Sequence, residues 1–208
     1  MAIADVKARL RRTLSATRGR AHDLAQEADA GDNAASASGF WASAFECLVD
    51  TFARIDGDAG EPVISGYRAV RSEPDVMPAL HAFAARGWRI ALPRVEGADR
   101  PLTFHAWNPG DAFVRGAFGI EEPSPASPRL TPHVVLVPLL GFDARGYRLG
   151  YGGGFYDRTL AGLRQRGRVV AIGIAYDAQE VDAVPIDRYD QRLDHVLTPS
   201  GLRSFQEP

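Results

Sequence analysis

Apolar residues recur every three to four positions in the N-terminal part of the chain, which is typical of amphipathic helices. Residues 4–30 combine this spacing with many Ala, Leu, Arg and Glu residues and predict one or two helices. A second helix is expected from about Gly39 to Ile55, where Ala44, Cys47 and Leu48 follow the same period. This spacing places Cys47 on the buried face, so we expect its thiol to lie in the core.

Shorter apolar runs follow, and they are typical of β-strands. Residues 133–138 are nearly all apolar, as expected of a strand that is buried on both faces. Helices are expected from Glu73 to Ala85 and from the end of a glycine-rich segment to about Arg166, and the four prolines of residues 121–132 predict a loop. Further strands are expected at 62–67, 88–92, 102–107 (with one wetter face), 169–174 and 194–198.

The strand and helix signals alternate along the chain. This pattern favours an α/β class, a Rossmann-like three-layer fold with a mainly parallel sheet between helices. A length of 208 residues suits one domain, which we place at 1–208. Ligands of such folds bind at the carboxyl ends of the strands. Because the strand at 133–138 leads into the glycine-rich segment, we expect the functional site there.

Composition argues against several functional classes. The formal net charge of -2 provides no overall attraction for nucleic acids or anionic membranes. Cys47 is the only cysteine, which excludes an internal disulfide and argues against a zinc cluster. No apolar run is long enough to span a membrane, and no secretory signal is visible. We therefore expect a cytoplasmic protein with no nucleic-acid or membrane partner.

The most informative segment is RLGYGGGFYDR at 148–158, in which four glycines occupy five positions. A glycine-rich backbone that opens a helix offers free N–H groups and the positive end of the helix dipole to an anion. The segment lacks the lysine of a P-loop and the third glycine of a dinucleotide-binding motif. A structural turn is the alternative, but a turn does not require Arg148, Tyr151, Tyr156 or Asp157.

Charged residues elsewhere have both a structural and a functional interpretation. Lys7 and Arg11 lie one helical turn apart, either on a solvated basic face or poised to bind phosphates. Glu73 could begin a helix or hydrogen-bond a polar heterocycle. Asp157 could be a first-turn helix charge and Asp190 a surface-loop residue, or both could bind Mg²⁺ beside phosphates.

Taken together, these segments resemble the 5-formyltetrahydrofolate cyclo-ligase family. The resemblance rests mainly on VPLLGFD at 137–143 and GYRLGYGGGFYDR at 146–158. Relatives often have His where this chain has Tyr189, and often Lys where it has Gly153. Shorter matches cover the rest of the chain: Lys7-x-x-Leu10-Arg11, Ser72-Glu73-x-Asp75, Leu92-Pro93, residues 116–123, Gln179 and residues 190–194.

The resemblance implies an enzyme that closes a ring in 5-formyltetrahydrofolate to give 5,10-methenyltetrahydrofolate. The implied cofactors are ATP and Mg²⁺, the products include ADP and phosphate, and a phosphorylated formyl group is the implied intermediate. A small-molecule substrate and a monomeric state are expected. Phosphoryl transfer depends on positioning and charge neutralisation, so the lack of a conspicuous protein nucleophile is consistent with this reaction.

The resemblance also implies roles for individual residues. Arg148 and Tyr156 would be catalytic, and Asp157 and Asp190 would hold the metal ion. The nucleotide would contact Lys7, Arg11, Arg148, Leu149, Gly150, Tyr151, Gly152, Gly153, Gly154, Phe155 and Tyr156. The folate would contact Glu73, Tyr151, Gly152, Gly153, Gly154 and Phe155.

Two other functions stay open at the level of sequence. One is a non-catalytic protein of the same fold that binds folate or a nucleotide, for which Tyr189 is the only support. The other, by analogy of fold alone, is a sugar-phosphate isomerase or an acyl-CoA transferase. The second would need a catalytic base paired with a different loop, and we find none in the sequence.

Overall fold

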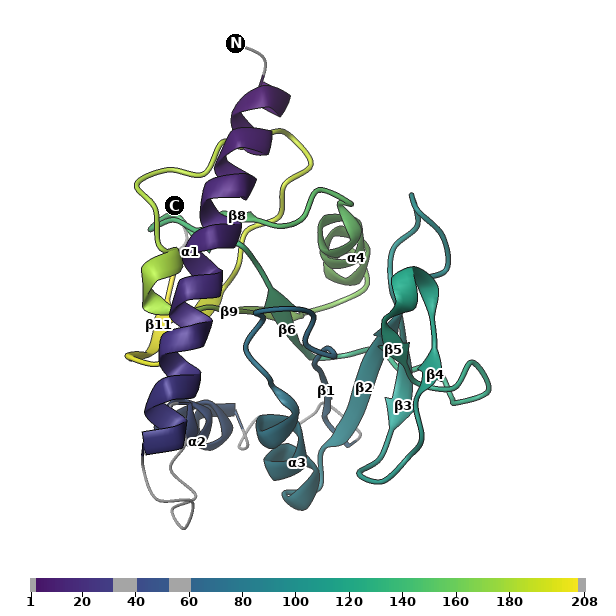
Figure 1. Cartoon of the computed structure of the whole chain (residues 1–208). Helices are drawn as coiled ribbons and strands as arrows, with labels where there is room; N and C mark the ends of the chain where they lie inside the picture. Colours follow the sequence, from purple (N-terminus) through teal and green to yellow (C-terminus); the bar gives the residue numbers. More distant parts are fainter. Residues whose placement is uncertain (1–2, 32–40, 53–60, 206–208) are drawn as a thin grey trace.

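A seven-stranded sheet organises the computed structural model, which describes residues 3–31, 41–52 and 61–205 (Figure 1). The strands of this sheet are β1 (Val63–Ser65), β2 (Arg89–Arg94), β3 (Thr103–Trp107), β6 (Val134–Pro138), β9 (Val170–Ile174), β10 (His195–Thr198) and β11 (Gly201–Ser204). Their order is β11-β10-β9-β6-β1-β2-β3. The five central strands are parallel, and the edge strands β11 and β3 are antiparallel to their neighbours.

Helices cover both faces of this sheet, so the predicted three-layer α/β class is confirmed (Figure 1). The helices are α1 (Ile3–Gly31), α2 (Ala42–Phe52), α3 (Met77–Ala85) and α4 (Phe155–Arg164). On β6, Val134 and Leu136 pack with residues of α2 and α3, whereas Val135 and Val137 pack with residues of α4. Alternate side chains of one strand thus enter two separate hydrophobic clusters, as expected for a strand that is buried on both faces.

Short elements connect the main ones, and the hydrophobic pattern did not predict them. A two-residue strand is too short to show a periodic pattern. One of these strands, β5, lies within the segment that was expected to be a loop. The short elements are β4 (Val114–Arg115), η1 (Ala117–Gly119), β5 (Glu121–Glu122), β7 (Gly141–Phe142), β8 (Arg148–Leu149) and η2 (Asp177–Gln179).

The prediction for α2 was wrong in one respect. The expected ends at Gly39 and Ile55 lie outside the described residues, and within them the helix covers 42–52 as expected. Cys47, however, is exposed. The buried positions of α2 are Ala44, Phe45, Leu48, Val49 and Phe52, so the apolar face is centred on the pairs 44/45 and 48/49 and leaves position 47 on the solvent side.

Two further boundaries differ from the predictions. The helix expected from Glu73 begins at Met77, where Asp75 Oδ1 accepts a hydrogen bond from the Met77 N–H at 3.0 Å. The strand expected over 88–92, ending at Pro93, continues through Pro93 to Arg94. Proline is tolerated there because the pairing with β1 ends at Ala91, so β1 requires no N–H from Pro93.

The prediction of a wetter face on β3 was wrong, because its residues are all buried or half-buried and the half-buried ones do not share one face. His105 is buried, and its Nδ1 lies 2.9 Å from the Ser127 carbonyl oxygen. The Pro128 carbonyl accepts a hydrogen bond from the Ala106 N–H at 2.8 Å. The loop that precedes β6 therefore covers the edge of the sheet, which a pattern within the strand itself does not reveal.

Among the residues that the structure describes, no helix has both the length and the apolar character needed to cross a membrane. The longest, α1, carries Arg, Asp and Glu residues along most of its length.

Leu136 provides a test of the doubly packed sheet, since it is fully buried in the central strand β6. We expect Leu136→Ala to lower the free energy of unfolding by about 2–5 kcal/mol, because it leaves a cavity in a close-packed core. Urea denaturation would measure the change. The control Leu24→Ala removes a side chain that is 66% exposed and should change stability by less than about 0.5 kcal/mol. Equal effects of the two variants would contradict the described packing.

Candidate functional site

A cleft of about 1170 Å³ opens where β1, β2 and β6 end. This is the edge at which parallel α/β sheets bind ligands. The walls come from α1, the segment after β1, the β4–β5 hairpin, the glycine-rich segment and residues 187–191. The cleft brings together every candidate site residue from the sequence: Lys7, Arg11, Glu73, Arg148, Leu149, Gly150, Tyr151, Gly152, Gly153, Gly154, Phe155, Tyr156, Asp157 and Asp190.

The glycine-rich segment turns directly into α4. Gly154 caps this helix with φ 64° and ψ 13°, in the left-handed region that glycine adopts without strain. Gly152 also has a positive φ of 107°, and a Cβ at this position would lie 3.1 Å from Cζ of Arg11. The N-terminus of α4, with its free N–H groups, therefore lies beside a guanidinium at the wall of the cleft.

Arg148 joins two walls of the cleft. Its side chain is only 4% exposed, and it donates hydrogen bonds to Asp157 Oδ1 at 2.8 Å and to the Gln191 carbonyl at 2.5 Å. Burial lowers the pKa of Arg148, an effect that the nearby Asp157 opposes, and a guanidinium stays charged in proteins. The Gln191 N–H donates to the same Asp157 oxygen at 3.0 Å, so residues 190–191 lie against the first turn of α4.

Lys7 is buried, so its interpretation as part of a solvated basic face is wrong. Its Nζ lies 2.7 Å from Asp190 Oδ2 and 2.9 Å from Asp187 Oδ2. Burial alone would lower the pKa of Lys7, but the hydrogen bonds to the two carboxylates outweigh burial and raise it. One turn further along α1, Arg11 donates from Nε to the Gly150 carbonyl at 2.9 Å. Thus α1 brings two cations to the glycine-rich segment and to residues 187–190.

Asp157 and Asp190 suit a cation that is shared with a phosphate-bearing ligand. Each has one oxygen that accepts the hydrogen bonds described above, and no described residue donates to its second oxygen. Within the described residues, no group of three or more His, Cys, Asp or Glu side chains could hold a metal ion. Mg²⁺ commonly binds one or two carboxylates together with substrate phosphates and water, so two carboxylates fit this ion.

Glu73 does not begin a helix but lies buried in the loop before α3. Its Oε2 accepts a hydrogen bond from the Val70 N–H at 2.8 Å. Burial raises its pKa, an effect that the Val70 hydrogen bond and the Arg18 guanidinium partly oppose. Burial also raises the pKa of the hydroxyls of Tyr67 and Tyr156, so both phenols are neutral hydrogen-bond donors at neutral pH.

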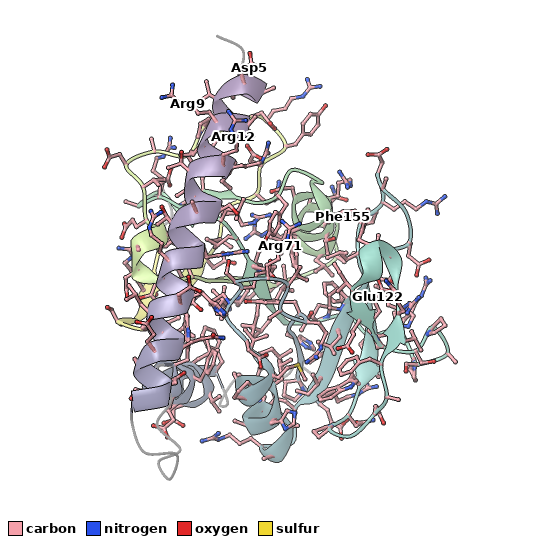
Figure 2. All side chains as sticks on the ribbon, viewed as in Figure 1. Asp5, Arg9, Arg12, Arg71, Glu122 and Phe155 are labelled. Atoms are coloured by element: carbon pink, nitrogen blue, oxygen red, sulfur yellow. The ribbon has the colours of Figure 1, made fainter. Side chains whose placement is uncertain are left out.

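Sequence reasoning missed three residues at or beside the cleft. Arg18 is fully buried on the same side of α1 as Leu14, and an arginine within an apolar stripe was the signal that could have revealed it. Phe118 is 73% exposed at the tip of the β4–β5 hairpin, and its ring centroid lies 6.2 Å from that of Phe155. Glu122 lies on the same hairpin (Figure 2). Its side chain is buried, and its Oε2 lies 3.1 Å from NH1 of Arg94.

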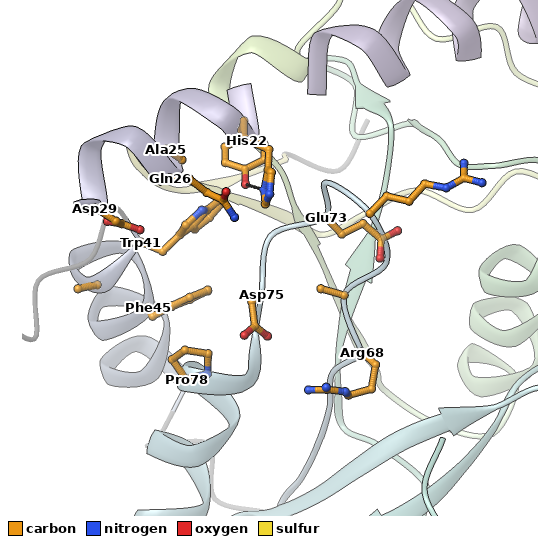
Figure 3. Close-up of a pocket in the computed structure, with 14 residues that line it drawn as sticks. His22, Ala25, Gln26, Asp29, Trp41, Phe45, Arg68, Glu73, Asp75 and Pro78 are labelled. Carbon is orange, nitrogen blue, oxygen red and sulfur yellow. Dashed lines mark hydrogen bonds between the residues drawn. The ribbon is translucent and has the colours of Figure 1, made fainter. Parts of the chain in front are cut away.

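A second cavity, of about 600 Å³, lies between α1, α2 and residues 68–78 (Figure 3). It is lined by Trp41, Phe45 and Tyr176 among others. Residues Arg68, Arg71 and Glu73 line this cavity and also the large cleft. The loop that bears Glu73 is therefore a wall shared by the two cavities.

Asp143 shapes the turn that precedes the glycine-rich segment. This fully buried carboxylate accepts hydrogen bonds from the N–H groups of Arg145, Tyr147 and Val184 at 2.9–3.2 Å. The Arg145 guanidinium donates to it as well, at 2.6 and 3.0 Å. Burial by itself would raise the pKa of Asp143, but these hydrogen bonds prevail and lower it.

Comparison with known proteins identifies similar sequences and folds. Residues 3–199 match the family model of 5-formyltetrahydrofolate cyclo-ligase. The chain is 35% identical over 144 residues to the 5-formyltetrahydrofolate cyclo-ligase of Mycolicibacterium smegmatis, covering 65% of this chain and 73% of that protein. It is also 35% identical over 144 residues to the 5-formyltetrahydrofolate cyclo-ligase of Escherichia coli K12, covering 67% of this chain and 79% of that protein.

Two solved structures have a similar fold. The NMR structure of Aquifex aeolicus 5,10-methenyltetrahydrofolate synthetase superposes with a TM-score of 0.68 at 25% identity, covering 98% of this chain and 94% of that one. A 5,10-methenyltetrahydrofolate synthetase from Mycoplasma pneumoniae superposes with a TM-score of 0.60 at 20% identity, covering 92% and 97% of the two chains. The second similarity supports the fold alone.

The Asp143 network predicts a pH-dependent contribution to stability. Because the pKa is lower in the folded state than in the unfolded chain, the contribution is complete above the unfolded pKa and is lost as pH falls through the folded pKa. We expect Asp143→Asn to lower the free energy of unfolding by about 1–3 kcal/mol at pH 7. The difference in the free energy of unfolding between Asp143→Asn and the unsubstituted protein should become smaller below about pH 4, where the carboxylate takes up a proton.

Urea denaturation at several pH values would check this prediction. The control Asp50→Asn changes an exposed carboxylate that pairs with Arg86 at 3.1 Å, and it should cost less than about 0.5 kcal/mol. A difference between Asp143→Asn and the unsubstituted protein that stays constant from pH 7 to pH 3 would contradict the role given to this carboxylate.

Proposed function

Because the chain belongs to the 5-formyltetrahydrofolate cyclo-ligase family of enzymes, we propose that it converts 5-formyltetrahydrofolate into 5,10-methenyltetrahydrofolate. The proposal includes dependence on ATP and Mg²⁺, with ADP and phosphate as further products. The observation that supports it most is a single cleft that combines buried cations, a glycine-rich helix N-terminus, two carboxylates and a separate buried Glu73. The monomeric state and the cytoplasmic location remain predictions.

The chemistry requires activation of an unreactive formyl group. The oxygen of a formamide is a poor leaving group. Attack of the formyl oxygen on the γ-phosphate would give a phosphorylated formyl (iminium phosphate) intermediate and ADP. The second folate nitrogen would then add to the formyl carbon, close the ring and lose its proton to solvent, and phosphate would depart with the former formyl oxygen. A site for this reaction must neutralise phosphate charge and align the two substrates.

Residues at one end of the cleft suit the phosphates. The N–H groups of residues 150–154 would cradle them, as at other glycine-rich helix N-termini. Lys7 and Arg11 would supply positive charge from α1, and Arg148 would do so from β8. The existing hydrogen bonds of Lys7 and Arg148 to carboxylates hold these cations in place without a ligand, which reduces the reorganisation needed on binding.

Asp157 and Asp190 would hold Mg²⁺ through the oxygens that no described residue hydrogen-bonds. When bound, the ion would neutralise phosphate charge and orient the transferred group. The residues themselves are prearranged, because Arg148 and the Gln191 N–H fix the Asp157 carboxylate, while Lys7 fixes that of Asp190.

Other residues of the cleft suit the folate. Glu73 would accept hydrogen bonds from the N–H groups of the pterin, and Tyr151 and Phe155 would contact its flat rings. Tyr156 lies on the first turn of α4 between the two proposed halves of the site. As a neutral phenol it would donate a hydrogen bond that orients the formyl group.

A single assay tests the proposed reaction. Purified protein is mixed with 5-formyltetrahydrofolate, Mg²⁺ and ATP, and the near-ultraviolet absorbance of the methenyl product is followed. We expect the absorbance to grow only when ATP is present, because the formyl oxygen must be phosphorylated before it can leave. If the absorbance does not increase although the protein still binds ATP, 5-formyltetrahydrofolate is not its second substrate.

The metal site predicts a specific change in the Mg²⁺ dependence. We expect Asp157→Asn to raise the Mg²⁺ concentration for half-maximal activity by about tenfold or more, since the variant loses a charged ligand of a hard cation. A Mg²⁺ titration of initial rates would measure it. The control Asp182→Asn changes an exposed carboxylate that does not line the cleft, and its titration should match that of the unsubstituted protein. Matching titrations for Asp157→Asn and Asp182→Asn would place the ion elsewhere.

A further inference from the structure

Arg18 is a buried cation that the proposed reaction does not use. It lies in the middle of α1, its side chain is 1% exposed, and it is not among the residues that line the cleft. Burying a guanidinium is costly unless hydrogen bonds and opposite charge compensate for the lost water. The partners of Arg18 therefore indicate which parts of the molecule this residue holds together.

One side of the guanidinium holds the loop that bears Glu73. Arg18 Nε donates a hydrogen bond to Ser72 Oγ at 3.1 Å, and NH1 lies 3.6 Å from Glu73 Oε1. In the close-up, Glu73 lies on the loop that leads to Asp75 and Pro78 at the start of α3 (Figure 3). Arg18 therefore holds this loop from the side of α1.

The other side of the guanidinium holds the end of β6 and the glycine-rich segment. NH1 donates to the Leu139 carbonyl at 3.2 Å, directly after β6. NH2 donates to the Tyr151 hydroxyl, and Cζ lies 5.3 Å from the centroid of the Tyr151 ring. The Tyr151 side chain is 47% exposed, so this contact with Arg18 limits where an otherwise loosely held ring can lie.

We propose that Arg18 is a positioning residue that sets the distance between Glu73 and Tyr151, the two walls between which the pterin-bearing substrate binds. This inference rests on the proposed function, because it assigns these two residues to the folate. A single planar group with donors on several edges reaches both walls, which a lysine cannot reproduce in one geometry. Loss of Arg18 should therefore weaken binding of the folate more than binding of the nucleotide.

The electrostatic surroundings of Glu73 lead to a second consequence. The charged and titratable groups around it are Arg18 from α1, Arg71 from its own loop, and the hydroxyls of Tyr67 and Tyr156. Arg18 favours the ionised carboxylate, whereas burial favours the neutral acid. Without Arg18, the Glu73 carboxylate should take up a proton at a higher pH and accept fewer hydrogen bonds from the substrate.

The test compares Arg18→Met and Arg18→Lys with Phe83→Leu. Phe83 is fully buried in α3 and lines neither cavity, so its variant is a control for a general loss of stability. We expect Arg18→Met to raise the KM for 5-formyltetrahydrofolate by about tenfold, the effect of one lost charged hydrogen bond, and the KM for ATP by less than about twofold. Arg18→Lys should lie between Arg18→Met and the unsubstituted protein, and Phe83→Leu should leave both KM values unchanged.

Two further measurements separate positioning from a structural role. Tyr151→Phe should raise the KM for the folate in the unsubstituted protein but add nothing in the Arg18→Met background, because the contact is already lost there. The acid limb of the pH profile of kcat/KM for the folate should move upward in Arg18→Met by about one pH unit. Phe83→Leu should not move this limb.

Calorimetric binding of 5-formyltetrahydrofolate without ATP makes the test independent of turnover. If the unsubstituted protein binds the folate but forms no methenyl product in the assay with ATP and Mg²⁺, the proposed reaction alone is overturned, and the same tenfold difference between Arg18→Met and the unsubstituted protein is then expected in Kd. No binding of the folate would overturn both proposals. Folate KM and Kd values in Arg18→Met that equal those of Phe83→Leu would overturn the role of Arg18. If Arg18→Met does not fold, Arg18→Lys and Tyr151→Phe decide between these outcomes.

Discussion

The parallel alignment of β1, β2, β6 and β9 is the constraint on which the rest of this structure depends. Parallel strands point their carboxyl ends to one edge, so the segments that leave them must converge there. Residues 67–73 leave β1, Pro93 and Val95 lie at the end of β2, and the chain leaving β6 leads into the glycine-rich segment. Segments that are far apart in the sequence thereby form a single cleft.

The sheet edge alone does not complete this cleft, because much of its charge comes from α1 and from residues 187–191. Lys7 reaches two carboxylates that lie about 180 residues away, and Arg11 reaches the carbonyl of Gly150. Each of these contacts ties the N-terminal helix to a segment of the site. Water screens the attraction between paired charges less in a partly buried site than at the surface. These ion pairs can therefore hold the walls of the cleft in place.

Burial gives the two halves of the cleft different electrostatic properties. In one half, Asp157 lies beside the buried Arg148 guanidinium and opposes the effect of burial on its pKa, an arrangement that suits the proposed nucleotide phosphates and metal ion. In the other half, burial raises the pKa of Glu73 and of two tyrosine hydroxyls, which suits hydrogen bonding to a polar heterocycle. This division agrees with a reaction in which a nucleotide and a folate meet.

The sequence by itself determined the α/β class, the central strand β6 and the candidate residues of the site, because a fully apolar run and a dense glycine motif are local signals. Only the tertiary structure decided which charges are buried. Lys7 was compatible with a solvated face and Cys47 with a core position. Arg18 lies within an apolar stripe of α1, but this pattern did not reveal which segments it contacts. Burial and ion pairing depend on segments that meet only after folding, and the periodicity of one helix contains no information about partners more than a hundred residues away.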